Sequence, residues 1–335
     1  MKKKKHKEHD FDVVIIGSGI VGLSSALYAA RFKLKALVIG NLHGGTLNYT
    51  DRIENYPGFH EVTGVELATK VKSHAEKFGV KIIEEEVVSV EKCQDQNFAS
   101  DGCSACFKVF TKEQHFHTKS IIFTTGTKWR ELQVPGEKRL KGRGVHTCAL
   151  CDGYAYTNKI VAVVGGSDSA AKEALLLSEY ASKVYIIYRG EKLRPEPITL
   201  EKVLSNEKIE VIYHTNVVAI NGSEKVRLVV LDRPYKGKTM LNVDAVFVHI
   251  GHVPLSQLAV RLGVNVNAKG EIVTNNMGTT NIDGVFAAGD VAQSEFKQAI
   301  TGVAQGVMAA YSAYKYVTEN NIICLLDDED YEDYE

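Results

Sequence analysis

An apolar run followed by a glycine-rich turn and a helical pattern opens this chain, and this order limits the fold more than any other feature. Residues 11–17, Phe-Asp-Val-Val-Ile-Ile-Gly, have the composition of a buried parallel strand. They lead into Gly-Ser-Gly-Ile-Val-Gly at residues 17–22, and a helix and a second strand at residues 35–39 are expected to follow. In such a turn the first glycine permits the bend, the second lets a pyrophosphate approach the backbone, and the third lets helix and strand pack closely. The segment is therefore predicted to bind a dinucleotide.

A second pattern of the same kind begins at residue 159. A strand is expected at residues 159–165 and another at residues 183–188, with a glycine turn and a helix between them. Ser167 stands where the second glycine belongs, so its side chain crowds a pyrophosphate, although its hydroxyl can donate a hydrogen bond. Guanidinium groups bind phosphate well, so two arginines after the second strand are expected to meet a 2′-phosphate; the alternative is that both are solvated surface side chains. The residues predicted to bind a nicotinamide dinucleotide are Gly165, Gly166, Ser167, Asp168, Ser169, Arg189 and Arg194.

A Cys-x-x-Cys-Asp motif, Cys148 to Asp152, lies just before this second pattern. Two thiols at this spacing can close and reopen a disulfide and so transfer two electrons. The adjacent Asp152 carboxyl can supply or remove the proton that each exchange step needs. Alone, the motif is equally consistent with half of a zinc site. Its position between two dinucleotide folds favours a redox-active dithiol formed by Cys148 and Cys151.

The closing segment returns to the first fold. Residues 284–291 are expected to form a strand that ends in Gly289-Asp290, followed by a long helix with apolar residues on one face. An acidic residue at a strand end can accept hydrogen bonds from sugar-type hydroxyls. The sequence thus predicts an α/β fold with two Rossmann-like dinucleotide-binding domains, the second inserted into the first. The FAD-binding domain is expected at residues 1–127 and 252–335, and the NAD(P)-binding domain with the dithiol at residues 128–251.

Composition excludes several partners and locations. The chain of 335 residues is long enough for two domains, and its net charge of −1 gives no reason to expect nucleic acid. No apolar run reaches the ~18 residues of a membrane span, and no signal-peptide core follows Met1, so a cytoplasmic protein without a membrane partner is expected. Six cysteines in a reducing compartment favour a functional dithiol over a disulfide scaffold. The basic residues 2–7 and the acidic residues 327–335 are expected to be solvated termini.

A second Cys-x-x-Cys, at Cys103 and Cys106, has His115 and His117 downstream. The spacing of these four residues is tighter than that of a usual zinc finger, so no metal site is predicted. An elongated hairpin with incidental thiols is expected, and an auxiliary redox or metal site is the alternative. His146, two residues before Cys148, is expected to be an ordinary surface histidine, and the alternative is that it tunes the pKa of the thiol.

With these segments in place, the sequence from about Phe11 to Val317 resembles the low-molecular-weight thioredoxin reductases, which are FAD-dependent pyridine nucleotide-disulfide oxidoreductases. The resemblance implies that Cys151 faces the flavin, that Cys148 attacks the disulfide of a partner, and that Asp152 is the general acid. It also implies a homodimer. The full set of residues predicted to bind FAD is Gly17, Ser18, Gly19, Gly22, Gly40, Asn41, Gly44, Gly45, Thr46, Leu47, Asn55, Val87, Thr125, Gly126, Gly289, Asp290, Lys297, Gln298 and Ala299.

The expected function follows from this resemblance. Two electrons are expected to pass from NAD(P)H through FAD and the dithiol to a thioredoxin- or glutaredoxin-like protein. Members that use NADPH usually carry a second arginine directly after the first, where this chain has Gly190, and an arginine where it has Lys297. The preference between NADPH and NADH is therefore open. Two alternatives remain at this stage, namely a ferredoxin- or deazaflavin-dependent reductase and a flavin-bearing redox sensor without rapid turnover.

Overall fold

The computed structural model describes residues 10–50, 53–93 and 106–320. It divides the chain into two compact units, one of residues 1–127 and 254–335 and the other of residues 128–253. Each unit has its own central β-sheet and its own buried core. Both termini of the chain thus belong to the first unit, and the second unit is a single continuous segment.

The sheet of the first unit is mostly parallel and is built around β1 (Phe11–Ile16). Its strand order is β3-β2-β1-β6-β5-β4, with β17 also paired to β6. Val13, Val14 and Ile15 are fully buried, as expected for a strand covered on both faces. The remaining strands are β2 (Ala36–Ile39), β3 (Lys81–Ile83), β4 (Ser89–Lys92), β5 (Phe107–Phe110), β6 (His115–Phe123) and β17 (Val285–Ala287).

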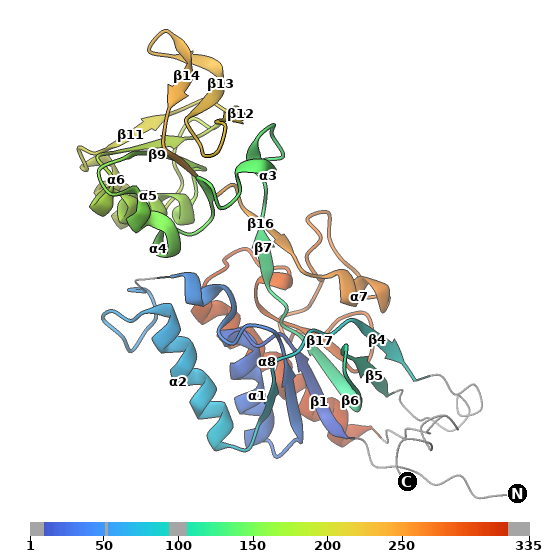
Figure 1. Ribbon diagram of the computed structural model, residues 1–335. Coiled ribbons are helices and arrows are strands. Elements are labelled where there is room, and N and C mark those ends of the chain that lie inside the picture. The colour runs from blue at the N-terminus through green and yellow to red at the C-terminus, as the bar shows by residue number, and fades with distance from the viewer. Residues whose placement is uncertain (1–9, 51–52, 94–105, 321–335) are drawn as a thin grey trace, which may run out of the picture. The chain divides into compact units, whose positions relative to one another are not determined.

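Helices α1 (Ile20–Arg31) and α8 (Ala299–Glu319) run side by side against this sheet (Figure 1). Their close approach depends on a small residue, because a Cβ atom at Gly306 would lie 2.6 Å from the Ser25 Oγ. The other helices of the unit are α2 (Gly64–Lys77), α7 (Gln257–Arg261), and the 3-10 segments η1 (Gly45–Tyr49) and η3 (Gly289–Val291). The described part of the segment with Cys106, His115 and His117 is antiparallel, since β4 pairs with β5 and β5 with β6. Cys103 and both charged termini lie outside the described residues.

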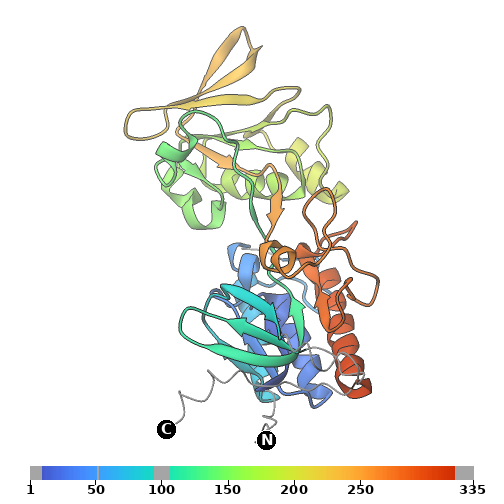
Figure 2. The same cartoon turned by 90° about the vertical axis from the view of Figure 1, so that its right-hand side faces the viewer.

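The second unit contains a five-stranded parallel sheet with the order β11-β10-β9-β15-β8. Its helix α5 (Asp168–Tyr180) buries Ala170, Ala174 and Leu177, the face that the sequence predicts. A three-stranded antiparallel sheet, β12-β13-β14, extends from this unit (Figure 2). The strands are β8 (Val145–His146), β9 (Ile160–Val164), β10 (Lys183–Ile187), β11 (Ile209–Ile212), β12 (Val217–Asn221), β13 (Leu228–Tyr235), β14 (Lys238–Asn242) and β15 (Ala245–Val248). The helices are α3 (Glu137–Leu140), α4 (Ala149–Asp152), η2 (Gly153–Tyr156) and α6 (Pro197–Leu204).

Two paired strands carry the chain from one unit to the other, β7 (Thr127–Trp129) outward and β16 (His252–Pro254) on the return. Gly126 precedes β7 with φ 65° and Gly251 precedes β16 with φ 107°, a conformation that favours glycine. No helix among the described residues is long and apolar enough to cross a membrane.

The first glycine turn yields a prediction about stability. A Cβ atom at Gly22 would lie 1.9 Å from the Gly17 carbonyl oxygen, so Gly22→Ala should lower the free energy of unfolding by about 1–3 kcal/mol or more. A Cβ atom at Gly19 meets nothing closer than 4.0 Å, and the φ of −69° suits any residue, so Gly19→Ala is the matched control when both variants are compared without FAD. Denaturant unfolding of both variants measures the difference. Equal stability of the two variants would contradict this account of the turn.

Candidate active site

Cys148 and Cys151 form a disulfide at the start of the short helix α4, with their Cα atoms 5.4 Å apart. Cys148 occupies the N-cap position of α4, and its Sγ accepts a hydrogen bond of 3.1 Å from the Cys151 backbone N–H. The Cys148 residue is only 6% exposed, whereas Cys151 is exposed. The spacing that the sequence analysis assigns to a redox pair therefore places two sulfurs within bonding reach, one of them open to solvent.

Asp152 is held by a histidine that the sequence analysis underestimated. The Nδ1 atom of His146 lies 3.0 Å from the Asp152 Oδ2, and its Nε2 lies 2.8 Å from the Tyr156 hydroxyl. The His146 ring is 8% exposed and stacks on Phe247, which pairs with it across β8 and β15. The expectation of an ordinary surface histidine is wrong, because this strand pairing buries the ring. Asp152, His146 and Tyr156 form a hydrogen-bonded chain that can hold and move a proton beside Cys151.

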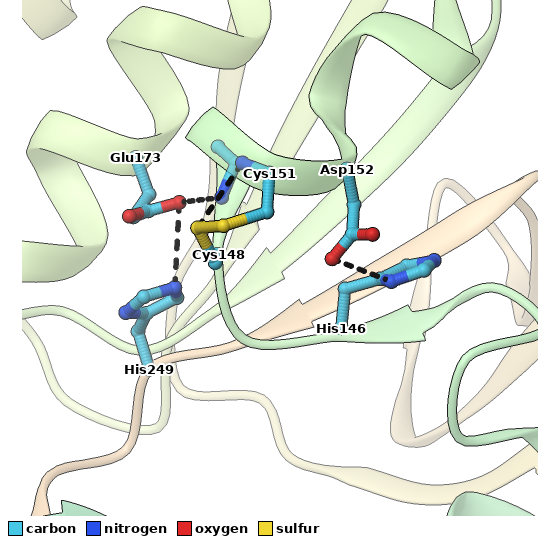
Figure 3. Close-up of a disulfide and its surroundings, with 7 residues drawn as sticks. His146, Cys148, Cys151, Asp152, Glu173 and His249 are labelled. Atoms are coloured by element: carbon cyan, nitrogen blue, oxygen red, sulfur yellow. Dashed lines mark hydrogen bonds and ion pairs between the residues drawn. A yellow bond between two sulfur atoms is a disulfide. The ribbon is translucent and has the colours of Figure 1, made fainter. Parts of the chain in front are cut away.

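A second acid–histidine pair, Glu173 and His249, lies on the other side of the disulfide in Figure 3. The Glu173 Oε2 accepts a hydrogen bond of 2.6 Å from the Ala149 backbone N–H and lies 3.6 Å from the His249 Nε2. Burial raises the pKa of Glu173 to about 7, against the lowering effect of the Ala149 N–H. The sequence analysis missed both residues. The one available signal was a glutamate beside Ala174 on a helix face that is otherwise apolar.

The residues predicted to bind FAD come together at the carboxyl ends of β1, β2, β6 and β17, where ligands bind in sheets of this type. The Gly44 N–H donates to the Ser18 carbonyl at 2.8 Å, which joins the first glycine turn to the segment after β2. Asn55 and Gln298 are 243 residues apart in sequence, and the Asn55 Nδ2 donates to the Gln298 Oε1 at 3.1 Å. Val87 is buried in the hydrophobic core of the first unit, in the cluster that also contains Ile39 and Val291.

Two observations fit this turn to a phosphate-bearing cofactor. The Ser18 Oγ is buried and has no hydrogen-bond partner among the described residues, a state that is costly unless a ligand supplies one. The neighbouring Gly19 leaves open space at its Cβ position, although Gly17 and Gly22 are tightly packed by backbone and side-chain atoms. Protein atoms therefore pack tightly against Gly17 and Gly22 but leave room at Gly19, where a pyrophosphate is expected to approach.

The second glycine turn is more crowded. A Cβ atom at Gly166 would lie 2.4 Å from the Tyr188 ring, and one at Gly190 would lie 2.6 Å from it, so the tyrosine covers this turn. Ser167 caps α5 without a side-chain hydrogen bond of its own. Arg189 and Arg194 are both exposed. The Arg194 backbone N–H donates to the Gly166 carbonyl at 2.8 Å, which places Arg194 beside the turn. Asp168, in the first turn of α5, pairs with Lys172 at 2.7 Å.

Comparison with known proteins decides the family. Residues 11–306 match the model of the pyridine nucleotide-disulphide oxidoreductases, which is most of the chain. The chain belongs to this family. Members with similar sequences include the thioredoxin reductases of Treponema pallidum (38% identical, covering 92% of this chain and 98% of the relative) and Bacillus subtilis (35% identical, covering 93% and 96%). The crystal structure of Lactococcus lactis thioredoxin reductase is similar with a TM-score of 0.86 at 37% identity, over 92% of this chain and 100% of that chain.

These comparisons confirm the predicted resemblance and the predicted fold class. The structure of thioredoxin reductase from T. acidophilum supports the same conclusion, with a TM-score of 0.83 at 34% identity over 92% of this chain and 99% of that chain. This oxidoreductase therefore has two dinucleotide-binding folds and a close Cys148–Cys151 pair.

Among the residues predicted to bind FAD, Lys297 makes contacts whose contribution to stability can be tested directly. Its Nζ lies 2.7 Å from the Glu271 Oε1 and 2.7 Å from the Asp290 carbonyl oxygen. Burial pushes the pKa of Glu271 upward, but the hydrogen bonds from Lys297 and Asn267 outweigh it and hold the pKa below 4.5. Lys297→Met leaves this carboxylate, 10% exposed, without its cation, so we expect a loss of about 1–3 kcal/mol of stability at pH 7.

The sign of the pH dependence follows from the lowered pKa. The Glu271–Lys297 contact stabilises the folded protein above the unfolded pKa of Glu271 and is lost as the pH falls through the lower folded pKa. The difference in unfolding free energy between wild type and Lys297→Met should therefore be smaller in acid than at pH 7. Urea unfolding at pH 7 and at an acidic pH measures it. Lys315→Met, which removes an exposed pair with Glu319, is the control and should change little. A pH-independent difference would contradict the assignment.

Proposed function

We propose that this oxidoreductase is a thioredoxin-disulfide reductase, which passes two electrons from a nicotinamide dinucleotide through FAD and the Cys148–Cys151 pair to a thioredoxin- or glutaredoxin-like protein. The observation that carries the proposal is the disulfide itself. It is formed on a short helix beside a dinucleotide fold, with an acid–histidine pair at hand to hold a proton. The thioredoxin reductases among its relatives match almost their whole length.

FAD is proposed to bind the first unit through the set assembled at the carboxyl ends of its strands. The Ser18 hydroxyl and the open face of Gly19 meet the pyrophosphate, Asp290 meets the ribityl hydroxyls, and Gln298 and Ala299 at the start of α8 contact the flavin ring. When bound, FAD supplies the two-electron chemistry that side chains lack. The protein residues orient it and close off the space around Gly17 and Gly22.

The dithiol and its neighbours carry the exchange with the partner protein. The Cys148 thiolate attacks one sulfur of the partner disulfide, the partner S–S bond breaks, and the released sulfur takes a proton from Asp152. Cys151 then gives its thiol proton back to Asp152 and attacks the Cys148 Sγ. The bond from Cys148 to the partner breaks, the internal disulfide re-forms, and the second partner sulfur leaves as a thiolate. His146 holds the Asp152 carboxyl in place at 3.0 Å. Cys148 is the less exposed of the two in the oxidised state, so its sulfur must become accessible for this attack.

The donor is proposed to be NADPH or NADH bound by the second glycine turn. Arg189 and Arg194 offer two exposed cations for a 2′-phosphate, whereas Gly190 offers none. One charged contact to a phosphate is worth about 1.5–3 kcal/mol, so a clamp of two arginines leaves the preference between the two coenzymes weaker than a clamp of three.

Three further properties are proposed from the family resemblance. The unit of residues 1–127 and 254–335 holds FAD, and the unit of residues 128–253 holds the nicotinamide dinucleotide. The enzyme is a homodimer. Its location is the cytoplasm, where cysteines outside the redox-active pair stay reduced.

Cys148→Ser tests the assignment of the dithiol. The variant cannot close the internal disulfide, so we expect it to retain FAD and to lose reduction of thioredoxin by several orders of magnitude. Flavin content is read from absorbance, and activity from the thiols released on thioredoxin. Cys93→Ser, in the first unit, is the control and should keep wild-type activity. Full activity of Cys148→Ser, or loss of activity in both variants, would contradict the assignment.

A further inference from the structure

Glu173 projects from α5 toward the first residue of the dithiol helix. Its side chain is 14% exposed, and its Oε2 accepts the Ala149 N–H at 2.6 Å. Ala149 directly follows Cys148, which caps the same helix. The carboxyl group is therefore fixed to the backbone next to one of the two reactive sulfurs.

His249 closes the other side of this carboxyl group. It follows directly after β15, its side chain is 0% exposed, and its ring stands edge-on to Trp129 with centroids 4.9 Å apart. Within the described part of the chain neither ring nitrogen has a hydrogen-bond partner. Burying an imidazole without hydrogen-bond partners costs free energy, so we expect a polar group beside it that offsets this cost. The carboxyl group of Glu173 lies there, with its Oε2 at 3.6 Å from the His249 Nε2.

The pair gains or loses one proton near neutral pH. Burial raises the pKa of Glu173 to about 7. Burial, followed by the charge of His252, lowers the pKa of His249 to about 3. The imidazole is therefore neutral, and the contact is that of a carboxyl group with a neutral ring and not an ion pair. The carboxyl proton is the one that can be gained or lost in the working pH range.

We propose that Glu173 is a positioning residue of the dithiol that regulates its charge: it anchors the Ala149 N–H and takes up a proton when a thiolate forms on the reduced cysteines. The proposal rests on the function proposed above. Two electrons and one proton convert the disulfide into one thiol and one thiolate as the S–S bond breaks. The new negative charge disfavours an ionised Glu173 nearby, so the carboxylate binds a solvent proton and becomes neutral. When the thiolate is consumed, the proton is released again.

Other charged groups around Glu173 are occupied elsewhere. On its own helix, Lys172 pairs with Asp168 at 2.7 Å. On α4, Asp152 pairs with His146 at 3.0 Å. From the segment after β15, His249 faces the carboxyl group directly, and the charge of His252 acts on His249. Two carboxyl groups therefore lie on opposite sides of the dithiol (Figure 3), Asp152 at 41% exposure and Glu173 at 14%.

The test compares Glu173→Gln with wild type in the FAD-loaded full chain after chemical reduction of the disulfide. Peptide-resolved alkylation of Cys148 by iodoacetamide is followed against pH. Wild type should show two inflections, because the thiol and Glu173 titrate as a coupled pair. Glu173→Gln keeps an oxygen that accepts the Ala149 N–H but carries no charge, so its profile should have one inflection, about 1 pH unit below the upper inflection of wild type. Glu179→Gln, an exposed position of the same helix, should match wild type.

A second measurement detects protonation of Glu173 even if the shift of the alkylation pH profile is too small to resolve. Reduced-minus-oxidised infrared difference spectra at pH 7.5 should show a protonated carboxyl band in wild type that is absent in Glu173→Gln. The proposal is overturned if Glu173→Gln matches wild type in both measurements while Glu173→Ala alone changes the alkylation profile, since Glu173 would then be only a backbone anchor. Neither measurement uses NAD(P)H or thioredoxin, so failure of the proposed function would appear separately, in turnover assays of wild type.

Discussion

The same backbone contact fixes the glycine turn of each unit, and the positions of the reactive groups depend on it. In the first unit a Cβ atom at Gly17 would lie 2.3 Å from the Thr124 carbonyl oxygen, and in the second a Cβ atom at Gly165 would lie 2.2 Å from the His249 carbonyl oxygen. Only glycine permits these approaches, which bring the end of the first strand of each unit against the chain leaving a neighbouring strand. In the second unit this contact also sets the backbone of His249, so the nucleotide turn and the environment of the dithiol share one support.

The disulfide is placed between groups of different exposure. Asp152 and His146 lie on the side of Cys151, and Asp152 is 41% exposed. Glu173, whose side chain is 14% exposed, binds the Ala149 N–H next to Cys148 and faces the fully buried side chain of His249. An exposed acid exchanges protons readily with solvent, whereas a buried acid responds to the charge beside it. The two sides of the dithiol can therefore perform different tasks during one cycle of reduction and oxidation, with proton supply on one side and charge compensation on the other.

The parts of the fold that depend on residues close together in the sequence could be predicted from it. The glycine turns, their flanking strands and the face of α5 that carries Ala170 and Leu177 need only neighbouring residues to be recognised. The partners of Cys148 and Asp152 could not be predicted in this way. His146 is buried because β8 pairs with β15. Glu173 meets His249 although the two residues lie in distant parts of the sequence. Such contacts follow from strand order and packing, which a pattern of single residues does not encode. The cofactor roles of individual residues stay predictions, because they depend on ligand contacts.

The central claim is that electrons enter through a nicotinamide dinucleotide and reach the dithiol through FAD. Anaerobic titration of the purified protein with NADPH and, separately, with NADH tests it most directly, with flavin absorbance and free thiols of Cys148 and Cys151 followed together. The account predicts that one coenzyme bleaches the flavin stoichiometrically and that two thiols appear. If neither coenzyme bleaches the flavin while dithionite does, the account of the donor is contradicted, and the crowded turn under Tyr188 does not serve as a nicotinamide site.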